Sequence, residues 1–207
     1  MVVELDGGCR VALLEDGKPR RRGNLRIWDR FRGEKVSMRV LELDGQATLR
    51  NKSVDEVLYM LRADIGIHVP AGATLPLEGS MTLIGVQTPR GPSELGGVQS
   101  VRLADVPIQR TGDRWYRELI QGETTLFVGS IPPGRAPDHF HLYEEVICIL
   151  LGEGIMHAGA SSTPIAAGSC IYLPRKQPHC LENTGSGELR LAGVFHPAGS
   201  PAVRYET

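Results

Sequence analysis

The chain has 207 residues, with 23 Lys and Arg against 24 Asp and Glu and a formal net charge of −1. This length can bury a sizeable core in one large or two small domains, and the balanced charge gives no general attraction to nucleic acid or to a membrane surface. Gly (25) and Pro (14) are abundant, whereas aromatic residues make up only 5%, a composition typical of short strands and tight turns. We expect an all-β protein with neither nucleic acid nor membrane as a partner.

Residues 1–6 lack the basic and apolar character of a secretory leader, and no segment approaches membrane-spanning length. The four cysteines contain no CxxC pair, and two of them, Cys148 and Cys170, lie in apolar runs where a free thiol behaves as a small hydrophobe. A reducing cytoplasm is the compartment that we expect.

Strands are predicted in the N-terminal half at residues 36–43 and 65–70. The basic run 18–22 precedes them and is interpreted as a solvated loop or subunit contact, because no nucleic-acid-binding motif accompanies it. The density of Gly, Pro and Ser at 88–97 indicates a linker. We therefore divide the chain into a first domain at 1–88, a linker with an edge strand at 89–112 and a second domain at 113–207.

The second domain begins with predicted strands at 113–120 and 126–131, followed by a Pro-Pro-Gly turn at 132–134. His139 and His141 come next and are two residues apart, so that on a strand both side chains leave the same face. A flanking turn can bring Glu145 beside them, and a distant strand can bring His179. Three imidazoles and a carboxylate can together bind a metal ion.

Two spaced runs carry these residues. The first places Gly134 before His139 and His141, then three residues to Glu145 and six to Gly152; the second runs from Gly168 over five residues to Pro174, then to His179 and Asn183. They resemble the two motifs of the cupin family over about residues 113–200. The resemblance implies a double-stranded β-helix, or jelly-roll barrel, with His139, His141, Glu145 and His179 as metal ligands, and it implies a homodimer.

Two positions leave a choice or depart from the motifs. The motif tolerates Glu144 as well as Glu145, and we prefer Glu145 because it shares a face with Ile147 and Ile149. Lys176 stands where the second motif has a glycine, and a lysine there is expected to avoid a positive φ. The remaining histidines, His68, His157 and His196, are interpreted as surface or satisfied core residues.

The N-terminal half contains a weak repeat of the second. Aligned on the motif, Arg50 and Lys52 replace the first two histidines, Glu56 falls on Glu145, and Leu75 replaces His179. This copy is about one hairpin shorter. We predict two tandem cupin barrels, the first without metal, in which the two cations pair with Glu56 and serve the scaffold; an anion-binding pocket is the alternative.

Three further side chains are candidates for substrate binding on position alone: Tyr143, Tyr116 and Arg117. Tyr143 lies in the ligand turn, whereas Tyr116 and Arg117 begin a strand near one mouth of the barrel. Arg117 can bind a substrate carboxylate, although a surface salt bridge is the simpler interpretation.

The ligand set leaves two positions free on an octahedral divalent metal. We predict one transition metal, with iron favoured over zinc, nickel or manganese, and an enzyme that acts on a small oxygen-rich molecule. Dioxygenase-type chemistry is slightly favoured. The alternatives are a redox-neutral isomerase or cyclase in which the metal is a Lewis acid, and a non-enzymatic binding protein.

Overall fold

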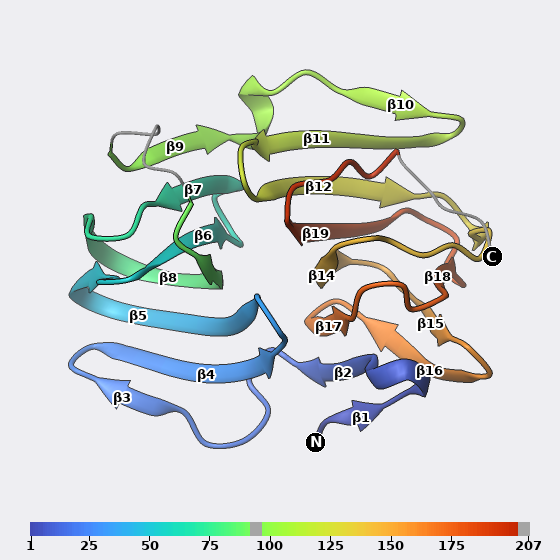
Figure 1. Cartoon of the computed structure of the whole chain (residues 1–207), viewed down its shortest axis with the longest axis horizontal. Coiled ribbons are helices and arrows are strands. Elements are labelled where there is room, and N and C mark those ends of the chain that lie inside the picture. The colour runs from blue at the N-terminus through green and yellow to red at the C-terminus, as the bar shows by residue number, and fades with distance from the viewer. Residues whose placement is uncertain (92–96, 203–207) are drawn as a thin grey trace.

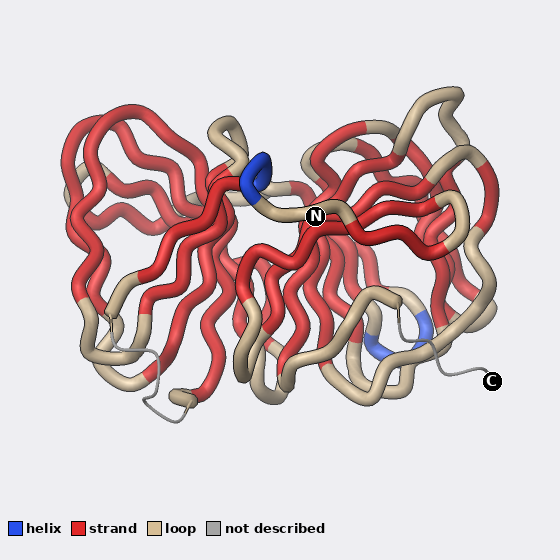
Figure 2. Tube along the Cα trace, turned by 90° about the horizontal axis from the view of Figure 1, so that it is seen from above, coloured by secondary structure: helices blue, strands red, loops and turns tan. Residues whose placement is uncertain are grey.

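The computed structural model describes residues 1–91 and 97–202, and these residues form an almost entirely β structure. Figure 1 shows the strands in two halves, and Figure 2 shows from above that the halves are two curved groups lying side by side. The described ranges also hold two short 3-10 helices, η1 (Asp6–Gly8) and η2 (Leu103–Asp105). The predicted all-β fold class is confirmed.

The N-terminal half is a seven-stranded antiparallel sheet with the order β3-β4-β5-β8-β6-β7-β9. Leucine and isoleucine side chains such as Leu41, Leu58 and Leu83 form its own core. The strands are β3 (Arg20–Arg22), β4 (Leu25–Arg32), β5 (Ser37–Arg50), β6 (Val54–Met60), β7 (Ile65–Val69), β8 (Thr74–Pro89) and β9 (Gln99–Arg102).

The C-terminal half has two sheets, one of eight strands in the order β1-β2-β17-β14-β19-β12-β11-β10 and one of four in the order β13-β18-β15-β16. The first contains β1 (Val3–Glu4), β2 (Arg10–Leu13), β10 (Gln109–Thr111), β11 (Arg114–Ile120), β12 (Thr125–Ile131), β14 (Glu144–Leu151), β17 (Ser169–Leu173) and β19 (Leu189–His196). The second contains β13 (Gly134–Arg135), β15 (Glu153–Ala158), β16 (Ser161–Ala166) and β18 (His179–Asn183).

Strand β14 is buried on both faces, and the alternating directions of its side chains explain how the two halves are joined. Ile147 and Ile149 point into the core of the C-terminal half, while Val146 and Cys148 point the other way. There they pack in a core that also contains side chains of the N-terminal half, among them Tyr59. Full burial of such a side chain contributes about 1.5–3 kcal/mol, so this shared core stabilises the pairing of the halves.

Strand pairing shows that the two halves repeat one arrangement. The order β4-β5-β8-β6-β7 in one sheet corresponds to β11-β12-β19-β14-β17 in the other. Glu56 of β6 faces Gln87 of β8, and Glu145 of β14 faces Phe195 of β19. The C-terminal half has the hairpin β15–β16 between β14 and β17, whereas β6 leads directly to β7. The repeat and its missing hairpin therefore agree with the sequence interpretation.

The sheets divide the chain differently from the predicted domains. Strand β2 pairs with β17, with Val11 opposite Ile171, so residues 3–13 complete the C-terminal sheet although we placed them in the first domain. Within the predicted linker, β9 pairs with β7 and β10 pairs with β11. Residues 92–96 of the linker and 203–207 of the second domain lie outside the described residues. The domain boundaries themselves remain a prediction.

Candidate metal centre

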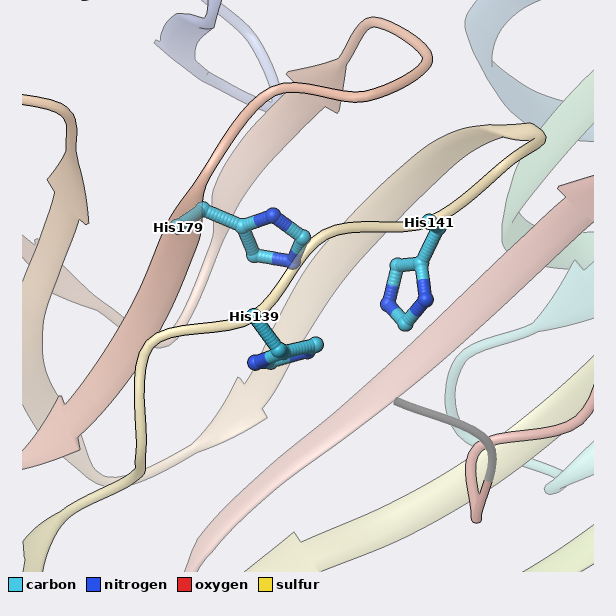
Figure 3. Close-up of side chains that lie close together, drawn as sticks. All are labelled: His139, His141 and His179. Atoms are coloured by element: carbon cyan, nitrogen blue, oxygen red, sulfur yellow. The ribbon is translucent and has the colours of Figure 1, made fainter. Parts of the chain in front are cut away.

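The three candidate histidines come from two neighbouring segments. His139 and His141 precede β14 and His179 begins β18. The first segment is not the regular strand that we predicted, because it joins β18 through one isolated bridge: His139 N donates to His179 O (3.0 Å) and His179 N donates to His139 O (2.8 Å). Figure 3 shows the three rings projecting into one space. One nitrogen from each lies within 4.8 Å of the others.

Hydrogen bonds to the backbone fix two of these rings. His139 Nδ1 lies 3.0 Å from Pro137 O, and His179 Nδ1 lies 2.8 Å from Gln177 O. A carbonyl oxygen only accepts, so each Nδ1 carries the proton and each Nε2 keeps its lone pair. Such bonds orient histidine ligands in metal sites. The Nε2 atoms of His139 and His179 can therefore each donate a lone pair to a metal ion.

Glu145 lies beside two of these histidines. Its Oε2 lies 3.4 Å from His141 Nε2 and 3.9 Å from His179 Nε2. The carboxyl group is buried, and Oε2 has no hydrogen-bond partner within residues 1–91 and 97–202. Burial raises the pKa of Glu145 to about 8, and burial together with the nearby His139 lowers the pKa of His179 to about 4. Without a cation, burial therefore disfavours the charged forms of Glu145 and His179.

The neighbouring Glu144 faces the other way. It accepts hydrogen bonds from the backbone amides of Glu34 (2.8 Å) and Lys35 (2.6 Å) and from the hydroxyl of Tyr172. Glu144 therefore bridges the two halves, and of the two adjacent carboxylates it is Glu145 that faces the histidines.

The donor set fits a divalent transition metal. Three imidazoles and one carboxylate are ligands that iron, zinc, nickel and manganese accept, and the partnerless Oε2 of Glu145 is an acceptor that a cation would satisfy. The spacing of the three histidine nitrogens is one that a single ion can span after small rotations of the rings. Of the described residues, only His139, His141 and His179 form a group of three or more candidate ligands.

A cavity of about 90 Å³ opens beside this group. Its wall is mostly apolar, with Phe127, Leu181 and Phe195 among its residues, and Arg114 and Tyr116 of β11 also line it. Sequence analysis did not single out Arg114. It lies two residues before Tyr116 in a predicted strand, so alternation could have placed both on one face.

The three predicted substrate-binding residues differ in placement. Tyr116 lines the cavity, and its hydroxyl donates to Gln109 Oε1 (3.0 Å). Tyr143 is buried beneath the site: its ring stacks on His141 with centroids 4.8 Å apart, and its hydroxyl donates to Ser200 O. Arg117 is not among the residues lining the cavity, and its guanidinium donates to Leu103 O (2.6 Å). Tyr143 therefore packs against the candidate metal ligand His141, whereas Arg117 lies on the face of β11 opposite to Tyr116.

Lys176 departs from what we expected. It adopts a φ of 61°, in the left-handed region that favours glycine. The turn that requires this conformation is held by the Lys176 amide, which donates to His141 O (2.7 Å). The strained residue thus links the turn before His179 to the backbone of a second ligand.

The N-terminal counterpart of the site is closed by an ion pair. Glu56 is fully buried, and Arg39 donates to both of its oxygens, each at 2.6 Å. Asn51 donates a third hydrogen bond (2.7 Å). Arg50 and Lys52 are exposed, so the prediction that they pair with Glu56 is wrong: the cation comes from β5, because Arg39 and Glu56 flank Gly85 on one face of the sheet.

Comparison with known proteins places the chain in one family. The cupin domain model matches residues 127–195. An oxalate-binding protein of Thermotoga maritima is 35% identical over 82 residues, which cover 38% of this chain and 68% of that protein. Among solved structures, a putative glyoxylate-induced protein of Pseudomonas aeruginosa superposes with a TM-score of 0.78 at 12% identity, over 95% of this chain and 91% of the other.

A variant of the Bacillus subtilis oxalate decarboxylase superposes with a TM-score of 0.70 at 14% identity, over 92% of this chain and 78% of the other. At such low identity, these two structural matches establish the shared fold alone. The part of the chain that the structure describes contains no helix both long and apolar enough to span a membrane.

Proposed function

The chain belongs to the cupin family, and we propose that it uses one divalent transition metal to bind a small carboxylic acid in its C-terminal half. The metal ligands would be His139, His141, Glu145 and His179. The observation that carries this proposal is the grouping of three histidine nitrogens within 4.8 Å of one another, beside a buried Glu145 oxygen that lies near His141 and His179 and has no hydrogen-bond partner among the described residues.

The cavity supports a compact, acidic ligand. When bound, the metal would act as a Lewis acid toward carboxylate oxygens. Arg114 on the wall offers a guanidinium, whose paired N–H groups match a carboxylate in geometry and charge. The rest of the wall is mostly apolar and the cavity is small, so a long polar ligand would neither fit nor find hydrogen-bond partners there. The name of the Thermotoga protein makes oxalate the first acid to test.

The residues that line the cavity fit a reaction at a bound metal better than acid–base catalysis by protein side chains. Among the described residues, the titratable side chains that line the cavity are the four proposed ligands, Arg114 and Tyr116. The Tyr116 hydroxyl is engaged with Gln109, and an arginine is not a base at neutral pH. An isomerase or cyclase that works by enolisation needs a general base. We therefore rank it below acid binding and below the dioxygenase-type reaction with iron, which remains a prediction.

Calorimetric titration tests the proposal. Oxalate is expected to bind the metal-loaded protein and to bind the chelator-treated protein at least about a hundredfold more weakly, because the metal supplies most of the interaction. Malonate, acetate and the neutral oxamide test the preference for size and charge. Equal binding of oxalate with and without metal would overturn the proposal. Oxygen uptake by the iron-loaded protein in the presence of a bound acid tests the dioxygenase prediction separately.

Two expectations complete the proposal. A homodimer is expected by resemblance to cupins, and light scattering coupled to gel filtration measures its mass. A cytoplasmic location is expected from the cysteines, whose thiols are all free and buried in the structure. A reporter fusion locates the chain in the cell.

A further inference from the structure

After β19 the chain continues into a segment, residues 197–202, that returns to the candidate metal centre; we call this segment the C-terminal strap. Gly199 O accepts a hydrogen bond from Thr125 Oγ1 of β12 (3.0 Å). Pro201 lines the cavity beside the three histidines. The strap is therefore fixed to the barrel at one point and forms part of the cavity wall at another.

The strap also contacts Tyr143, which follows His141 by two residues. The Tyr143 hydroxyl donates to Ser200 O (3.3 Å). An added Cβ at Gly199 would lie closer than 3.0 Å to three consecutive atoms of the Tyr143 ring, Cδ1, Cε1 and Cζ. Carbon atoms pack at about 3.5–4.0 Å, so only a residue without a Cβ lets the strap lie this close to the ring.

Two other rings contact the Tyr143 ring. It stacks on His141, with centroids 4.8 Å apart and planes 12° apart, and the Phe195 ring lies 4.6 Å away. Phe195 in turn lies 5.6 Å from His141. All three side chains are buried. Because the cluster is closely packed, a displacement of Tyr143 by the strap would be passed on to His141.

The three candidate histidines are oriented by different contacts. Nδ1 of His139 and Nδ1 of His179 each lie beside a backbone carbonyl oxygen. The contact that the structure shows for the His141 ring is its packing against Tyr143 and Phe195. Removing a contact that orients a metal ligand typically weakens metal binding by about 10–100-fold. The packing around His141 is therefore expected to affect metal affinity.

We propose that Gly199 is a positioning residue for the metal site. By its close approach to Tyr143, the C-terminal strap would hold the His141 ring in the orientation that a metal ligand needs. Gly199 is not among the residues that line the cavity, so it acts through Tyr143. This inference rests on the proposed function, because the metal site is the one that His141 would complete.

Zinc titration of the full chain after chelator treatment tests the proposal. Gly199→Ala is expected to weaken zinc binding about tenfold, because the added methyl group displaces the Tyr143 ring and with it His141. Gly187→Ala, where an added Cβ would meet no atom within 4 Å, is the matched control and should bind zinc as the wild type does. Circular dichroism checks that both variants are folded. Equal zinc affinity in Gly199→Ala and the wild type would overturn the proposal.

A double-variant cycle separates positioning from a general loss of stability. Tyr143→Leu removes the ring, so adding Gly199→Ala to it should change zinc affinity by less than about threefold. The same tenfold loss from Gly199→Ala with and without the ring would contradict the proposal. Tyr143→Leu should bind zinc more weakly than Tyr143→Phe, which keeps the ring. If Gly199→Ala does not fold, equal affinity in these two variants overturns the proposal.

Failure of this inference and failure of the proposed function give different results. Loss of zinc in His141→Ala together with full affinity in Gly199→Ala would overturn the positioning role alone, whereas zinc retained in His141→Ala would overturn the metal site itself. Nuclear magnetic resonance of the chelator-treated protein adds a measurement without metal. Gly199→Ala should shift the ring signals of His141, which the Tyr143 ring current affects, and leave those of His157 unchanged. Unchanged His141 signals would contradict the proposal.

Discussion

The two halves of this chain place a buried glutamate at the same register position, but only the glutamate of the N-terminal half is paired with a cation of the protein. Glu56 receives two hydrogen bonds from Arg39 and one from Asn51. Glu145 has an oxygen without a hydrogen-bond partner in the described chain and faces the candidate histidines. The comparison teaches that one scaffold can neutralise this carboxylate with an internal guanidinium or keep it for an external cation.

The strand positions around each glutamate extend the contrast. Arg39 faces Gly85 as Phe127 faces Gly193, and Leu41 faces Leu83 as Gly129 faces Leu191. In the N-terminal half these residues fill the interior with a salt bridge and leucine. In the C-terminal half, Gly129 leaves space and Phe127 supplies an apolar wall. Among the residues that the structure describes, a cavity and a group of candidate ligands therefore occur together only in the C-terminal half.

The largest effect is expected from removing a proposed ligand. His141→Ala should lose most of the bound metal, because it deletes one of four donors, while the barrel remains folded. Elemental analysis after purification without added metal or chelator measures it, with circular dichroism as the check on folding. His157→Ala is the control, since His157 pairs with Glu182 away from the cavity. Equal metal content in the two variants would show that the ligands are wrongly assigned.

The next largest effect is expected in the N-terminal half. Arg39→Ala leaves the fully buried Glu56 without its cation, and breaking a buried pair in this way costs about 3–5 kcal/mol. Urea unfolding measures the loss. The double variant Arg39→Met with Glu56→Leu removes both charges and should recover most of the stability. If Arg39→Ala has the same free energy of unfolding as the wild type, the ion pair does not stabilise the N-terminal half in the place of a bound metal.

Filling the cavity should separate ligand binding from metal binding. Gly129→Leu copies Leu41 of the other half, and an added Cβ at Gly129 would meet its neighbours at 3.4 Å or more. We expect at least about tenfold weaker oxalate binding with unchanged metal content, and a loss of stability of about 1–3 kcal/mol. Gly187→Leu, where an added Cβ would meet no atom within 4 Å, is the matched control. Full oxalate affinity in Gly129→Leu would place the ligand elsewhere.

The smallest effect concerns pH. Because burial raises the pKa of Glu145 to about 8, the metal-free folded chain keeps a proton that the unfolded chain has lost, and stability falls as pH rises toward 8. His179, with its pKa lowered to about 4, acts in the opposite direction below pH 6.5. Between about pH 6.5 and pH 8 the glutamate should therefore dominate, by at most about 1.4 kcal/mol per pH unit.

Thermal unfolding of the chelator-treated protein across that range measures the slope. Glu145→Gln should flatten it, since an amide does not titrate. The same slope in wild type and Glu145→Gln would contradict the assignment.

Sequence reasoning predicted the all-β class and the repeat from composition and spacing. The grouping of His139, His141, Glu145 and His179 was predicted from the resemblance of two spaced motifs to those of the cupin family; two-residue alternation alone would have misled, because the segment with His139 and His141 is not a regular strand. Sequence reasoning missed Arg39 as the partner of Glu56, since a cross-strand pair depends on register between strands. Chain order also suggested that β2 belongs with the first domain, but the strand pairs with β17. The positive φ of Lys176 was missed because residue preference argues against it, and only the tertiary structure imposes it.

The account is tested most directly by anomalous X-ray scattering from crystals of the metal-loaded protein. It predicts a single strong peak per chain within bonding distance of His139, His141, Glu145 and His179, and none beside Glu56. A peak at another place, or no peak near those four side chains at saturating metal, would contradict it.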